Sequence, residues 1–88
     1  MEERIVIFKG KVVCVSVFDG CTPGPNDDIN QEKEFAEVVI RKDRPLVVVR
    51  GANKPPENYT RVVREIIPDE NGNFTINTLA ASYHVKVH

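Results

Sequence analysis

Residues Ile66 to Val87 read IIPDENGNFTINTLAASYHVKV, and this stretch decides the fold class. The segment 68–72 (PDENG) has the composition of a tight turn, because an Asn-Gly pair readily adopts positive φ. After it, apolar and polar residues alternate over 73–77 and again over 83–88. An alternation of period two is typical of a β-strand with one buried face. The stretch therefore predicts a β-hairpin followed by a final strand.

The rest of the chain has the same character. Residues 11–18 (KVVCVSVF) alternate in the same way, and 5–8 and 46–49 are short apolar runs. The 88 residues include 14 Val and 7 Ile, against 2 Leu, 4 Ala and 1 Met. Since β-branched side chains lose rotamer freedom in helices and pack well on pleated sheets, a mainly helical fold is not expected. The length fits one domain, residues 1–88.

Two segments leave an α+β alternative open, with helices at about 31–42 and 56–67. In the second segment Tyr59, Val62, Val63 and Ile66 would share one helical face, and Pro56 and Pro68 could bound the helix. The residue types there favour a strand, whereas the periodicity favours a helix.

The stretch 66–87 resembles the close of carboxypeptidase regulatory-like domains, which are transthyretin-like (prealbumin-like) β-sandwiches. The matching residues are Asp69, Gly72, Phe74, Leu79, Tyr83 and Val85. The resemblance implies an all-β sandwich in which Asp69, Gly72, Phe74 and Tyr83 form a structural hairpin motif. It also implies a non-catalytic spacer, recognition or assembly module, because the chain ends in Lys86-Val87-His88 and lacks the tail of the hydrolase branch.

Candidate chemical groups are few. On a strand, His84 and His88 would stand about 13 Å apart, which is too far to ligate one metal ion. Cys14 and Cys21 form no metal-binding or redox motif, and whether they pair stays open. No nucleophile elbow or phosphate loop is present. We therefore expect no enzyme activity, no metal and no cofactor.

The charges are unevenly distributed although the formal net charge is only −1. Residues 19–37 carry six acidic side chains and one Lys, and residues 41–65 carry seven basic and three acidic ones. The second region defines a possible partner-binding patch: Arg41, Arg44, Arg50, Tyr59, Arg61 and Arg64. Such a patch could bind an acidic protein or nucleic acid. Nucleic acid is the less expected ligand, because Tyr59 is the only aromatic residue between Phe35 and Phe74.

The favoured partner is a protein, or a second copy of the chain joined through an edge strand, since unprotected strand edges tend to pair. The first residues, MEERIVIF, lack the basic start of a signal peptide, and no segment has the roughly 20 apolar residues of a membrane span. We therefore expect no membrane association. We expect a cytoplasmic location if the chain is full-length, and an extracellular one if it is a domain of a secreted protein.

Overall fold

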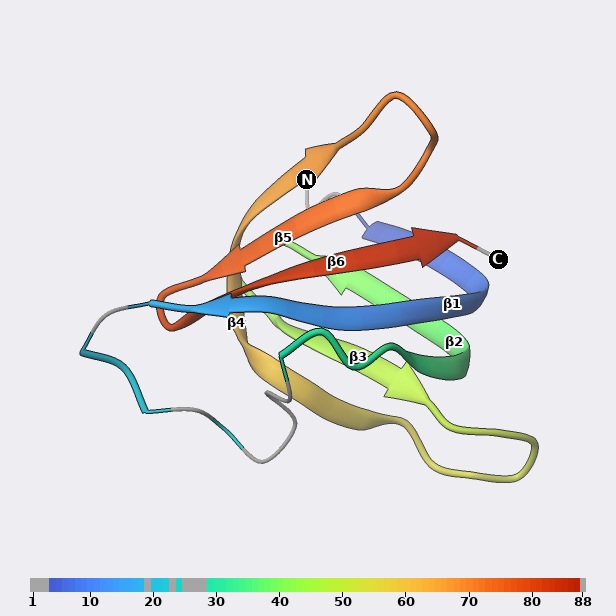
Figure 1. The fold of residues 1–88 in the computed structure, drawn as a ribbon. Coiled ribbons are helices and arrows are strands. Elements are labelled where there is room, and N and C mark those ends of the chain that lie inside the picture. The colour runs from blue at the N-terminus through green and yellow to red at the C-terminus, as the bar shows by residue number, and fades with distance from the viewer. Residues whose placement is uncertain (1–3, 19, 23, 25–28, 88) are drawn as a thin grey trace.

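The computed structural model describes residues 4–18, 20–22, 24 and 29–87, which form six β-strands in an antiparallel order (Figure 1). The strands are β1 (Arg4–Val17), β2 (Lys33–Arg41), β3 (Pro45–Val49), β4 (Glu57–Pro68), β5 (Phe74–Thr78) and β6 (Ala81–Val87). The all-β prediction is confirmed. The α+β alternative is wrong, because the segments 31–42 and 56–67 contain β2 and β4 instead of helices.

Each strand pairs with the next along the chain, and β6 pairs with β1 to close a barrel. The two longest strands make the closure possible. Residues 4–12 of β1 pair with β2, while residues 10–17 pair with β6. Strand β4 likewise pairs with β3 in its first half and with β5 in its second half. A sandwich of two separate sheets, which the resemblance implied, is not confirmed by this pairing.

Irregular pairing explains why 57–67 looked helical in sequence. In β4, Tyr59 and Val63 are buried and Ile66 packs against the core, so inward residues are spaced by four and then three. This spacing coincides with two register shifts, one opposite Pro45 to Val47 and one between Val63 and Glu65. Because a bulge re-aims the side chains that follow it, a strand with such shifts imitates helical periodicity.

The core fills the barrel with side chains from all six strands. The largest fully buried side chains are Tyr83, Phe35, Ile40, Leu46, Ile76, Val12, Val38, Val48, Val63 and Val85. Gly10 lies where β1 passes from β2 to β6. A Cβ atom there would meet Val38 Cγ2 and Ile7 Cγ2 at 3.2 Å each, so the backbone comes close to its neighbours at this point.

The two cysteines do not pair. Cys14 is buried in β1 and its Sγ lies 3.8 Å from the carbonyl oxygen of Ser16, while the Sγ of Cys21 lies 3.7 Å from that of Leu79. Among the strands described, none is a free edge along its whole length, since each has a hydrogen-bonded neighbour on both sides. A dimer through a complete edge strand therefore has no surface here, and any contact between copies must use another part of the barrel.

Candidate functional site

The structure divides the predicted basic patch between the two ends of β3. Arg44 immediately precedes β3 and Arg50 immediately follows it, and the six residue-to-residue steps of extended chain between them span about 20 Å. Arg41 lies near Arg44, because the Arg44 amide donates a hydrogen bond to the Arg41 carbonyl oxygen. Arg61 and Arg64 lie on β4, on the Arg44 side of the barrel.

Arg50 and Tyr59 are engaged in other contacts: Arg50 in an exposed ion pair with Glu57, and Tyr59 in the core. The Tyr59 side chain is only 5% exposed, and its ring meets the edge of Phe35 with the ring centroids 5.0 Å apart. The guanidinium of Arg50 lies 5.5 Å from the Phe35 ring and donates a hydrogen bond of 2.8 Å to Glu57, which raises the pKa of Arg50. Tyr59 is therefore a core residue, and it offers no exposed face on which a base could stack.

Arg61 and Arg64 both line an open hollow of about 400 Å³, which we name the arginine hollow. Its lining consists of Pro45, Arg61, Val62, Arg64 and Leu79. Pro45 and Val62 face one another in the β3–β4 pairing, so they form a continuous apolar wall. The hollow therefore combines an apolar surface with two cationic side chains, a combination typical of a recognition site with few, well-placed polar groups.

A turn packed against β4 positions the charged side of the hollow. In this turn Asp43 has a positive φ of 64°, and its amide donates to the Val63 carbonyl oxygen at 2.8 Å. The Val63 amide donates in return to the Arg44 carbonyl oxygen at 2.9 Å. The Asp43 carboxylate then lies 3.6 Å from the Arg64 guanidinium. This ion pair is solvent-exposed, and such pairs hold side chains only loosely, so Arg64 can exchange Asp43 for another carboxylate.

A second turn presents Leu79, which lies outside the partner-binding patch predicted from the sequence. The buried hydroxyl of Thr78 accepts hydrogen bonds from the amides of Ala80 (3.1 Å) and Ala81 (3.0 Å) and donates to the Ala81 carbonyl oxygen. This fixes the turn between β5 and β6 and leaves Leu79 71% exposed. A large apolar residue within a short turn was the only sequence signal for this part of the hollow.

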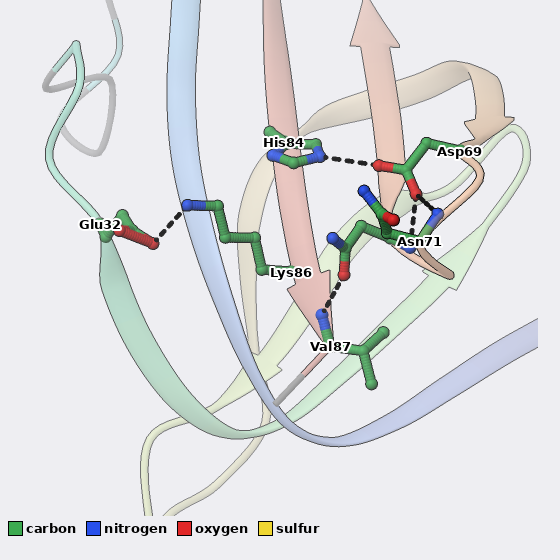
Figure 2. Close-up of polar contacts among 7 residues, drawn as sticks. Glu32, Asp69, Asn71, His84, Lys86 and Val87 are labelled. Carbon is green, nitrogen blue, oxygen red and sulfur yellow. Dashed lines mark hydrogen bonds and ion pairs between the residues drawn. The ribbon is translucent and has the colours of Figure 1, made fainter.

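The predicted hairpin motif forms the turn between β4 and β5 (Figure 2). Oδ1 of Asp69 accepts hydrogen bonds from the amides of Asn71 (2.8 Å) and Asn73 (2.9 Å), and Gly72 has a φ of 79°. Partial removal from water raises the pKa of Asp69, but the two amides and His84 together outweigh it and hold the pKa below its usual value. Phe74 packs against the core, and Tyr83 on β6 is buried within it.

Polar contacts occupy much of the outer side of β6 (Figure 2). His84 lies beside Asp69, the Lys86 ammonium lies 3.2 Å from Glu32, and the Val87 amide donates to Oδ1 of Asn73 at 3.0 Å. Across the described residues, no group of three His, Cys, Asp or Glu side chains is placed to hold a metal ion. Nor does the described part of the chain contain a helix that is long and apolar enough to cross a membrane.

Comparisons with known proteins do not assign this chain to a family. No protein family, no curated protein and no solved structure matches this chain.

Proposed function

We propose that the barrel is a non-catalytic recognition module that binds an acidic segment of a partner protein in the arginine hollow. The observation that carries the proposal is that Arg61 and Arg64 line the same hollow as the apolar residues Pro45, Val62 and Leu79. A peptide with one apolar side chain between carboxylates fits this chemistry, since the apolar group can lie against Val62 and Leu79 while the carboxylates bind the two guanidinium groups.

An acidic peptide suits the hollow better than single-stranded nucleic acid does. Binding of single strands depends on exposed aromatic rings on which bases stack. Tyr59, the aromatic residue of the predicted patch, is buried against Phe35. The relationship to carboxypeptidase regulatory-like domains remains a prediction from residues 66–87, and the non-catalytic role rests on the same resemblance.

Fluorescence anisotropy with a labelled peptide, in which glutamates flank a single leucine, tests the proposal. We expect saturable binding that weakens as salt is added, because added ions screen exposed charge pairs. Arg61→Gln and Arg64→Gln should each weaken binding by roughly two- to fivefold, the effect of losing one exposed ion pair. Leu79→Ser should also weaken binding without loss of fold, because this side chain is already exposed.

Arg50→Gln is the matched control. It removes the same charge from the other end of β3, about 20 Å from Arg44, so peptide affinity should stay unchanged. Equal losses in the Arg50 and Arg61 variants would show that only net charge matters and would contradict a defined site. Tighter binding of a homopolymeric DNA strand than of the peptide, lost in the Arg61 variant, would replace the acidic segment with nucleic acid.

A further inference from the structure

The outer face of β1, β2 and β3 carries an apolar row where a solvent-facing barrel surface should be polar. Val6 pairs with Val39, and Val39 pairs with Val47, so the three valines form one row across three strands. Their side chains lie on the outer face, because the residues that alternate with them belong to the core: Ile7, Val38, Ile40, Leu46 and Val48. Within the row Val6 is 39% exposed and Val47 is half-buried, whereas Val39 between them is only 8% exposed. Sheets with one solvated face normally alternate apolar-in and polar-out, and this row departs from that pattern.

A neighbouring row adds the most exposed aromatic residue of the described chain. Phe8 pairs with Glu37, and Glu37 pairs with Val49, which places these three side chains beside the valine row. The Phe8 ring is 74% exposed. Valine and phenylalanine side chains gathered on one face are characteristic of an interaction surface, whereas single exposed apolar residues are not.

Charges on the two sides of the valine row have opposite character. On one side Arg4 pairs with Arg41, and on the other side Phe8 pairs with Glu37. Each of these rows lies about 6.7 Å from the valine row, the spacing of two residues along a strand. The face therefore has a cationic row, an apolar row and a row with one carboxylate and one exposed ring.

This order makes the face complementary to itself. Two copies can pack with these faces together, related by a two-fold axis that runs along the valine row. The strands of the second copy then lie in the same order as those of the first but run in the opposite direction. This arrangement lays the exposed Val6 over Val6 of the second copy, Glu37 over Arg41 of the second copy, and Phe8 over Arg4 of the second copy. The first contact is apolar, the second is an ion pair, and the third is a guanidinium against an aromatic face.

We propose that this face, which we name the valine face (Val6, Phe8, Glu37, Val39, Arg41, Val47 and Val49, with Arg4), is the interface of a homodimer formed by two antiparallel copies. Three short rows of side chains cover a small area, so the dimer is weak and belongs with interfaces below about 1,200 Å² in total. The proposal is independent of the arginine hollow.

Sedimentation equilibrium of the intact chain, from about 10 µM to about 1 mM, covers the range in which small interfaces associate. We expect the weight-average mass to rise from 9.9 kDa toward twice that value and to fall again in high salt. Glu37→Arg and Arg41→Glu should each remain monomeric, because each variant would bring like charges together across the two-fold axis. An equimolar mixture of the two variants should regain the dimer, since both contacts are then between opposite charges.

Phe8→Ser tests the face without relying on the charged variants, because an exposed ring contributes little to folding, and it should abolish the dimer. Ile67→Ser is the matched control: this residue of β4 is also an exposed apolar side chain but lies outside the valine face, so the variant should dimerise as the original does. A chain that stays monomeric at the highest concentration overturns the proposal. So does a mixture of folded charge variants that associates no better than either variant alone.

Discussion

Nε2 of His84 lies 3.4 Å from Oδ2 of Asp69, so a residue of the last strand contacts the first residue of the turn between β4 and β5. The other carboxylate oxygen of Asp69 accepts the amides of Asn71 and Asn73 within the turn. One carboxylate therefore both orders the hairpin and connects it to β6. The negative form of Asp69 is the form that all three contacts favour.

We predict that this carboxylate makes the stability of the barrel depend on pH in the acid range. The pKa of Asp69 is lowered in the folded chain, so the unfolded chain takes up a proton at a higher pH than the folded one. The contribution is present above the unfolded value, about 3.9, and is lost as the pH falls through the lower folded value. NMR titration of the Asp69 carboxyl carbon, with urea unfolding at several pH values, measures both effects.

The variant His84→Gln separates the strand contact from the turn contacts. It removes one of the groups that lower the pKa of Asp69, and it leaves the amides of Asn71 and Asn73 in place. The midpoint of the Asp69 titration should therefore move up only part of the way toward that of free aspartate. A midpoint in the original chain at or above the ordinary value would show that these contacts do not favour the ionised form.

Gly72 gives a second prediction about the same turn. Its φ of 79° is unfavourable for residues with a Cβ atom, although a Cβ there would touch nothing within 4 Å. Gly72→Ala should therefore lower the free energy of unfolding by about 1–2 kcal/mol through backbone strain alone. Gly51→Ala is the control, because Gly51 has equal space and no positive φ. Equal effects of the two substitutions in urea unfolding would contradict this explanation.

The sequence predicted the strands whose residues alternate with a period of two, and it left the segments of β2 and β4 open between strand and helix. The alternation in 11–17 and 83–87 and the turn chemistry of 68–72 correspond to β1, β6 and the β4–β5 turn. The inward residues are not spaced by two along β4, nor between Phe35 and Val38 of β2, and these are the segments that suggested helices. Register shifts arise from contacts with neighbouring strands, so a one-dimensional pattern cannot place them. Closure of the barrel also depends on pairs far apart in sequence, such as Val12 with Val85.

Charge clustering in the sequence grouped Arg61 and Arg64, which line the arginine hollow, with Arg50, which lies at the other end of β3. It could not show that Tyr59 points into the core. Leu79 went unassigned because its role depends on the fold bringing the β5–β6 turn next to β4.

The placement of Tyr59 leads to a prediction that compares two aromatic residues. Tyr59→Ala should lower the free energy of unfolding by about 3–5 kcal/mol, because it removes a buried ring that packs on Phe35. Phe8→Ala should change it by less than about 1 kcal/mol, as is usual for exposed positions. Chemical denaturation of both variants, measured at concentrations low enough to keep the chain monomeric, provides the comparison. Similar losses at the two positions would mean that Tyr59 is not a core residue.

Thr78 is the last test, because its hydroxyl supports the turn that presents Leu79. Thr78→Val keeps the shape of the side chain but removes the acceptor for the amides of Ala80 and Ala81. Leaving buried amides without an acceptor costs about 1–3 kcal/mol in unfolding free energy. Peptide binding in the arginine hollow should weaken as well, since Leu79 loses its fixed position.

Thr75→Val is the control for this substitution, since Thr75 lies three residues earlier on β5 and is only half-buried. It should leave both the unfolding free energy and peptide binding nearly unchanged. Loss of stability in the Thr78 variant with full peptide affinity would show that Leu79 does not need a fixed turn to line the hollow. Loss of affinity without loss of stability would instead point to a direct contact between Thr78 and the peptide, which its burial argues against.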